Sequence, residues 1–86
     1  MTVQALRLTI LRTLAEVQPY ALPAPQLFAE LNRLARPPVS AVTFAEQIGW
    51  LHDRGLVDFL PDPMDPDNAE ARKWFLKEAG AAALKA

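Results

Sequence analysis

The apolar pattern of the chain changes its period at Gly55, and this change limits the folds that the sequence can adopt. Before Gly55, Ile48 and Leu51 continue a series of apolar residues spaced three to four positions apart, as on one face of a helix. Directly after it, residues 56–60 (LVDFL) are short, apolar and rich in strand formers. The sequence therefore predicts a helix over 40–54 that leads directly into a strand, with Gly55 as the left-handed residue that ends the helix.

Two more helices are expected before this junction. A stripe of apolar residues at helical spacing predicts the first over 2–18, with Thr2 as its N-cap: Val3, Leu6, Ile10, Leu14 and Val17. A proline-rich connector follows, and leucines at 27, 31 and 34 predict the second over 25–35. Ser40 is a good N-cap for the third helix.

The C-terminal third of the chain has the pattern of a β-hairpin and a final helix. Strands are predicted over 56–60 and 72–76, because both runs are short and contain aromatic or β-branched residues. The segment between them is dense in Pro, Asp and Asn, which indicates a long hairpin tip. The alanine-rich end predicts a short helix over 78–85, which Gly80 should weaken.

The length and composition of the chain exclude several classes of protein. Its 86 residues predict a single domain with a modest core and little room for a deep catalytic cleft. It contains no cysteine, so disulfides and thiolate metal sites are excluded and a reducing cytoplasm is expected. Arg7 and Arg12 interrupt the N-terminal apolar stretch, which therefore resembles neither a signal peptide nor a membrane span.

Residues that could support catalysis or metal binding are scarce. His52 is the only histidine, and its neighbour Asp53 does not face it on a helix. With 3 glycines the chain has no glycine-rich phosphate loop. We therefore expect no catalytic residues, no metal and no cofactor, and we do not expect an enzyme.

The order of these elements resembles the winged helix-turn-helix family over nearly the whole chain. Five residues are similar to the family's L-x-x-L-x-x-x-G-L-V turn after the third helix: Ile48, Leu51, Gly55, Leu56 and Val57. Residues 74–80 (WFLKEAG) are similar to the Y-x-L-T-x-x-G of many bacterial transcriptional regulators, although Lys77 replaces the usual threonine. The resemblance implies an α+β fold with three core helices, a two-stranded wing and a short C-terminal helix, in a single domain over 1–86.

The resemblance also implies a function. In this family the third helix enters the DNA major groove and the wing touches the adjacent backbone. A small transcriptional regulator of bacterial or phage type would then use Thr43 and Gln47 to contact bases. Its phosphate contacts would come from Arg33, Arg36 and Arg54.

The distribution of charge favours a different partner. Between Asp58 and Glu70 there are five acidic residues and no Lys or Arg, and the whole chain has a net charge of −1. Such a wing would be repelled by phosphates. The alternative function is a protein–protein interaction module, in which exposed Val42 and Trp50 hold a protein partner. Trp50 could instead fold back against the hairpin near Trp74 or Phe75.

A second apolar patch on the first helix bears on oligomeric state. Leu8, Leu11 and Ala15 lie to one side of the main stripe, and a helix that is apolar on two sides usually has two neighbours. The C-terminal segment or a second subunit could be that neighbour. The second possibility predicts a homodimer.

Overall fold

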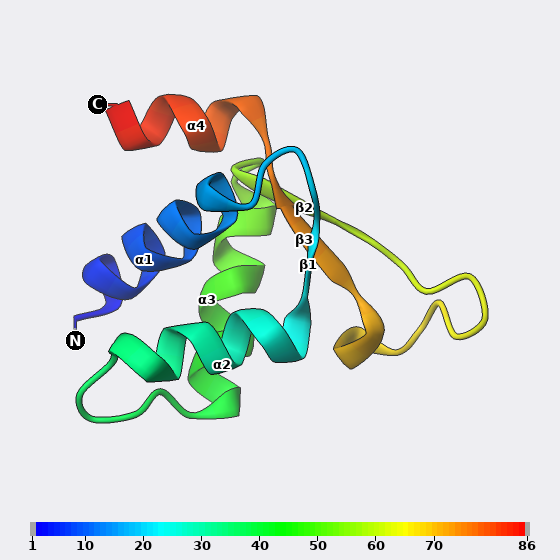
Figure 1. The fold of residues 1–86 in the computed structure, drawn as a ribbon, viewed down its shortest axis with the longest axis horizontal. Helices are drawn as coiled ribbons and strands as arrows, with labels where there is room; N and C mark the ends of the chain where they lie inside the picture. The colour runs from blue at the N-terminus through cyan, green and yellow to red at the C-terminus, as the bar shows by residue number, and fades with distance from the viewer. Residues whose placement is uncertain (1, 86) are drawn as a thin grey trace.

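The computed structural model describes residues 2–85 and combines a helical body with a small antiparallel sheet (Figure 1). Along the chain the elements are α1 (Val3–Glu16), β1 (Leu22–Pro23), α2 (Ala24–Leu34), α3 (Ala41–Asp53), β2 (Val57–Leu60), the 3₁₀ turn η1 (Ala69–Ala71), β3 (Lys73–Leu76) and α4 (Glu78–Lys85). The predicted α+β class is confirmed, with the three core helices, the hairpin and the C-terminal helix in the predicted order.

Helix ends form where the sequence supplies the required side chains. Thr2 Oγ1 accepts a hydrogen bond of 3.0 Å from the Ala5 amide at the start of α1. Ser40 Oγ accepts one of 3.1 Å from the Thr43 amide at the start of α3. After α3, Gly55 has a φ of 74°, a conformation that costs glycine nothing, and the chain turns directly into β2. These caps confirm the predicted junction.

The predicted two-stranded wing is present, and the sheet has a third strand, β1, that the sequence did not predict. The strand order is β1-β3-β2, with Leu22 opposite Trp74 on one side of β3 and Phe59 opposite Trp74 on the other. The sequence did not predict β1, because prolines lie in and beside it and proline is unfavourable in most strand positions. Pro23 is tolerated here because β1 is an edge strand.

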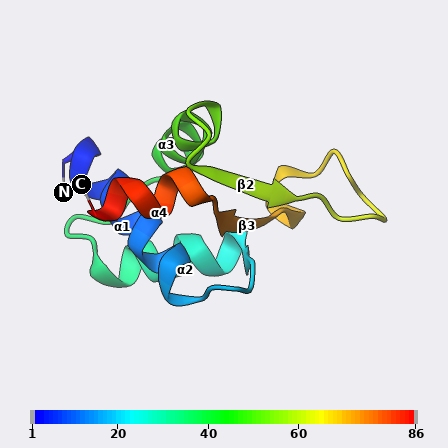
Figure 2. The ribbon, with the colours of Figure 1, turned by 90° about the horizontal axis from the view of Figure 1, so that it is seen from above.

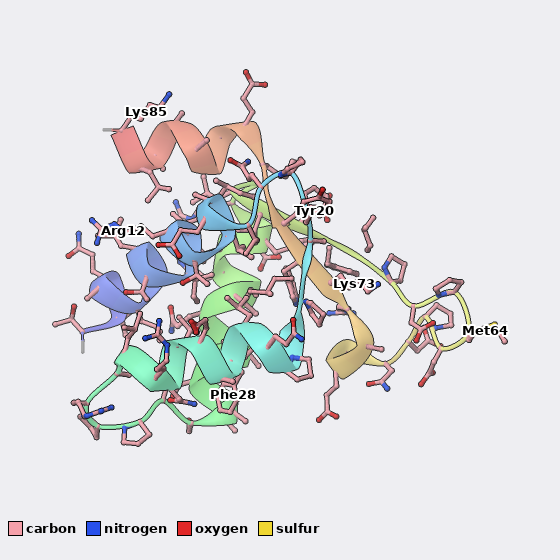
Figure 3. All side chains as sticks on the ribbon, in the orientation of Figure 1. Arg12, Tyr20, Phe28, Met64, Lys73 and Lys85 are labelled. Atoms are coloured by element: carbon pink, nitrogen blue, oxygen red, sulfur yellow. The ribbon has the colours of Figure 1, made fainter. Side chains whose placement is uncertain are left out.

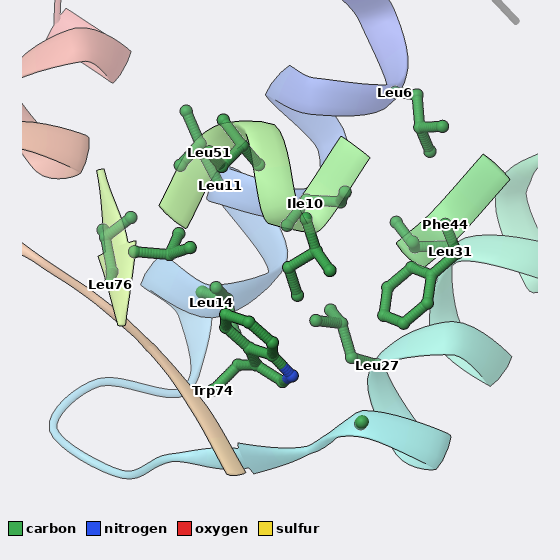
Figure 4. Packing of buried hydrophobic residues seen from close by; sticks show 13 residues of the cluster. Leu6, Ile10, Leu11, Leu14, Leu27, Leu31, Phe44, Leu51, Trp74 and Leu76 are labelled. Carbon is green, nitrogen blue, oxygen red and sulfur yellow. The ribbon is translucent and has the colours of Figure 1, made fainter. Parts of the chain in front are cut away.

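One core joins the helical body to the sheet (Figure 4). Its fully buried side chains come from all three long helices and from β2: Ile10, Leu14, Leu27, Leu31, Leu51 and Val57. Trp74 from β3 lies beside Leu14 and Leu27, so the central strand closes the space between α1 and α2. The sheet is therefore anchored to the body through its central strand.

The C-terminal helix α4 packs against α1 and approaches β2 closely. Gly80 is buried, and a Cβ atom at this position would collide with the Leu56 carbonyl oxygen and the Leu76 side chain. The Lys77 amide donates a hydrogen bond of 3.0 Å to the same Leu56 oxygen. The glycine that weakens the helix pattern in the sequence is thus the residue that lets α4 dock.

The wing, defined as β2, β3 and the loop between them, extends away from the helices (Figure 2). Its strands pair from Val57 opposite Leu76 to Leu60 opposite Lys73. All residues from 63 to 70 are exposed, in contrast to the strands behind them. The wing tip therefore contributes little to the core.

Candidate nucleic-acid interface

The third helix buries one face and leaves the opposite face accessible. Phe44, Ile48 and Leu51 are buried, while Val42 is 70% exposed. Thr43 and Gln47 are half-buried on the accessible side, one helical turn apart. The predicted recognition face therefore lies at the surface, but its polar side chains already have partners within the protein.

Thr43 belongs to the cap of its own helix. Ser40 Oγ accepts from the Thr43 amide and donates a hydrogen bond of 3.0 Å to Thr43 Oγ1. This arrangement follows from the Ser-x-x-Thr spacing, which places both hydroxyls at the first turn of α3. The Thr43 hydroxyl oxygen is thus an acceptor for Ser40, and its own proton can be donated elsewhere.

Gln47 is joined to α1 by a residue that the sequence did not single out for this site. Arg7 Nε donates a hydrogen bond of 2.8 Å to Gln47 Oε1, and the two residues are 40 positions apart in the chain. The only signal for Arg7 in the sequence was a charge inside an apolar stretch. Such a position is common for a solvated helix residue, so it did not indicate a role in the site.

Trp50 lies beside the same arginine. The Arg7 Cζ atom is 3.6 Å from the centre of the indole ring, and the Arg54 Cζ atom is 4.5 Å from it. These are cation–π distances, which hold the guanidinium groups against the ring. Within residues 2–85 no aromatic ring pair joins Trp50 to Trp74 or Phe75. Trp50 is half-buried and packs against the edge of the core.

The arginines of the candidate site differ in whether an acidic side chain pairs with them. Among residues 2–85, Arg7 and Arg54 form no ion pair. Arg33 pairs with Glu30 at 3.0 Å, and this hydrogen-bonded pair lowers the pKa of Glu30 and raises that of Arg33. Arg36 Nη1 donates a bond of 3.0 Å to the Ala35 carbonyl oxygen. The structure thus brings Arg54 together with Arg7, and it leaves Arg33 and Arg36 at the end of α2.

The acidic tip of the wing extends away from the helices (Figure 2). Met64, which is 91% exposed, marks the tip of the loop, and Arg12 on α1 lies at the other end of the molecule (Figure 3). Asp62 accepts a hydrogen bond of 2.9 Å from the Met64 amide and so shapes the tip. Asp65, Asp67 and Glu70 are exposed and form no ion pair within residues 2–85.

Comparison with solved structures identifies this arrangement. A MarR-family transcription regulator superposes on 93% of this chain with a TM-score of 0.66 and 21% sequence identity. The fold is a winged helix-turn-helix. The match covers 46% of the regulator, so this chain spans about half of its length. No protein-family profile matches the sequence, and no curated protein has significant sequence similarity to it.

The patch proposed for dimerisation lies mostly inside the winged-helix domain. Leu11 is 3% exposed and belongs to the core, and Leu8 and Ala15 are half-buried. The helix α4 is the second neighbour of α1, as one of the two alternatives predicted. Leu11 is therefore unavailable to a second subunit, because the C-terminal segment of the same chain covers this side of α1.

The lone histidine lies at the junction of the winged-helix body and the wing. His52 Nδ1 is 3.6 Å from an Asp53 oxygen and Nε2 is 3.5 Å from an Asp58 oxygen, while its ring lies 5.3 Å from that of Phe59. No group of three potential ligands for a metal occurs in the described part of the chain. Likewise, none of the helices within residues 2–85 has the length and apolarity needed to cross a bilayer.

Proposed function

We propose that this chain binds double-stranded DNA through α3, as the DNA-binding domain of a transcriptional regulator. One observation carries the proposal. Arg7 and Arg54 gather over Trp50 on the accessible side of α3, and neither has an acidic partner within residues 2–85. Guanidinium groups without a carboxylate are well suited to phosphate oxygens, which they bind in pairs of hydrogen bonds. The likeness in fold to a transcription regulator supports the same function.

The charges of the domain suggest how DNA would be placed. The accessible side of α3 has Arg7 and Arg54 beside Trp50, whereas the charged side chains of the wing tip, residues 63–70, are all carboxylates. Carboxylates within a Debye length of phosphates, about 10 Å at moderate salt, oppose binding. We therefore propose that α3 enters the major groove and that the tip of the wing stays away from the phosphate backbone. Thr43 and Gln47 are the proposed base-reading residues.

Binding to random-sequence duplex DNA tests this proposal. Fluorescence anisotropy should show an affinity that falls steeply as salt rises, since counterions are released from each contacted phosphate. Arg54→Ala should weaken binding and reduce the log-log salt slope by about 1. Arg33→Ala is the matched control, because Arg33 is already paired with Glu30 and its loss should matter less. Absence of binding at low salt would count against nonspecific DNA contact through this face.

A second candidate function is a protein-interaction module, which the acidic wing and the exposure of Val42 favour. It gains support if the domain binds no DNA and if Val42→Asp and Trp50→Ala each abolish recovery of one and the same protein partner. Recovery that neither substitution changes would exclude α3 as its surface.

Assembly and location remain predictions. A homodimer is expected only if a surface other than Leu11 holds it, because that side chain is buried. Light scattering of the wild-type chain measures the mass directly, and a monomeric mass would exclude the dimer. A cytoplasmic location in a bacterium or phage-infected cell is proposed from the absence of cysteine and the likeness to a regulator.

A further inference from the structure

We infer that Trp50 is a positioning residue for DNA binding, because its ring holds Arg7 of α1 and Arg54 beside α3 together as one phosphate-binding pair. The inference rests on the proposed DNA-binding function and extends it in one respect. The phosphate contact comes from two helices rather than from α3 alone. Trp50 acts through the two arginines and does not itself have to contact DNA.

The Trp50 ring is anchored in the protein and still accessible to the arginines. It is half-buried and packs against the edge of the core. The Cζ atoms of Arg7 and Arg54 lie over it, 3.6 Å and 4.5 Å from the ring centre. A ring anchored in this way restricts both long side chains before DNA binds, which lowers the side-chain entropy that binding costs.

The two arginines reach this ring from different helices. Arg54 directly follows α3, whereas Arg7 belongs to α1, which packs against α3 (Figure 1). Arg7 Nε also donates its hydrogen bond of 2.8 Å to Gln47 Oε1, so the ring and this bond together fix the plane of the Arg7 guanidinium. The ring covers a face of the group and Gln47 takes only the Nε proton. The edge formed by the two Nη atoms is therefore the part that binds a phosphate.

The acidic residues nearest in sequence do not neutralise the pair. Asp53 precedes Arg54, but its carboxylate lies 3.6 Å from His52 Nδ1. Glu46, one turn before Trp50, is exposed and forms no ion pair among residues 2–85. Two positive charges against one ring repel each other, and a phosphate that contacts both offsets this repulsion. The pair should therefore bind a phosphate more strongly than either arginine alone.

Binding of random-sequence duplex DNA by Trp50 variants tests the inference. Trp50→Leu keeps an apolar side chain but loses the aromatic face, and should weaken binding by about three- to tenfold. Trp50→Met provides the same test if Trp50→Leu does not fold. Trp50→Phe keeps an aromatic face and should bind within about twofold of wild type. Circular dichroism and the midpoint temperature of thermal unfolding establish that each variant is folded.

A double-mutant cycle shows whether Trp50 acts through the arginines. In a protein that already carries Arg7→Met and Arg54→Ala, the further substitution Trp50→Leu should change the affinity by less than about twofold. A tryptophan that contacts DNA directly would lose the same affinity with or without the two arginines.

The helix α1 supplies a test that leaves Trp50 intact. Arg7→Met should weaken binding by about three- to tenfold and reduce the log-log salt slope by about 1, as expected for one lost phosphate contact. Arg12→Met is the matched control, because Arg12 is exposed on the same helix and forms no ion pair in the described residues 2–85. It should bind within about twofold of wild type, since a distant charge is screened by salt.

Four results would overturn the inference while leaving DNA binding intact. They are wild-type affinity in Trp50→Leu, a loss in Trp50→Phe as large as in Trp50→Leu, an undiminished effect of Trp50→Leu without the two arginines, and an Arg7→Met variant that binds as well as Arg12→Met. Absence of binding by the wild type at low salt would instead overturn the proposed function, and the inference with it.

Discussion

The helical body and the wing of this domain differ in how much they bury and in the sign of their surface charge. The body supplies five of the six large side chains that are completely buried, and it presents arginines at its surface. The wing is anchored by its strands, has eight consecutive exposed residues at 63–70, and carries acids there without a single Lys or Arg. The exposed tip of the wing thus differs from the body both in burial and in the sign of its charge. The domain has the fold of a winged helix, but the tip of its wing is negatively charged, whereas an element that binds phosphates would be positively charged.

The largest expected difference between the two regions concerns stability. Leu27→Ala removes a fully buried side chain from the body and should lower the free energy of unfolding by about 2–5 kcal/mol. Met64→Ala at the wing tip should change it by less than about 0.5 kcal/mol, since Met64 is almost wholly exposed. Urea unfolding followed by circular dichroism measures both. Equal losses in the two variants would show that the wing tip is part of the cooperative core.

Two glycines lie in helices, and only Gly80 has other atoms close to the position of a Cβ. Gly80→Ala forces a Cβ into the Leu56 carbonyl oxygen where α4 meets the wing, and should cost about 1–3 kcal/mol. Gly49→Ala in α3 meets nothing within 4 Å and should raise the free energy of unfolding by about 0.5–1 kcal/mol. The midpoint temperature of thermal unfolding should therefore fall in Gly80→Ala and rise in Gly49→Ala. A stabilised Gly80→Ala variant would contradict the close approach of α4 to Leu56.

Neutralising the wing tests whether its acids oppose DNA. The double substitution Asp65→Asn and Asp67→Asn should raise the affinity for random duplex by about two- to fivefold at low salt, and less at high salt. Glu78→Gln with Glu16→Gln makes the same charge change on the body and serves as the control. Anisotropy titrations compare the two doubles. A loss of affinity on neutralising the wing would mean that its carboxylates make favourable contacts.

The smallest expected effect is a pH dependence on the surface of the body. The bond from Arg33 lowers the pKa of Glu30 below its ordinary 4.5. A carboxyl with a lowered folded-state pKa stabilises the fold above its ordinary pKa, and this contribution disappears as the pH falls through the folded-state value. Carbon-detected NMR should show Glu30 titrating below 4.5 in wild type and near 4.5 in Arg33→Ala. An unchanged titration would show that the pair does not persist in solution.

The sequence predicted what depends on neighbours along the chain. The caps at Thr2 and Ser40 and the turn at Gly55 follow from residue chemistry within a few positions, and all three were anticipated. The strand β1 was not, because its partner lies some 50 residues away at Trp74 and its own two residues include a proline. Neither the apolar periodicity of the sequence nor the strand propensity of residues 22–23 indicates that β1 pairs with β3.

The candidate site was predictable only in outline. The helical wheel placed Thr43, Gln47 and Trp50 on the accessible face of α3, as the structure does. It could not show that Arg7 bonds Gln47, since the two residues come from different helices. It also could not distinguish a patch covered by α4 from one covered by a second subunit, and the structure shows Leu11 buried within the same chain, at 3% exposure. The Arg7–Gln47 hydrogen bond and the packing of α4 on α1 are both contacts between elements that are distant in sequence.

The two tryptophans of this chain occupy contrasting surroundings, with consequences for spectroscopy. Trp74 is buried against Leu14 and Leu27, whereas Trp50 is half-exposed beneath two guanidinium groups. The emission of Trp74 should therefore change when the core opens, and that of Trp50 when anything draws Arg7 or Arg54 away from its ring. With Trp50→Phe and Trp74→Phe as separate single-indole proteins, the molecule provides its own label-free optical signals, one for unfolding and one for occupancy of α3.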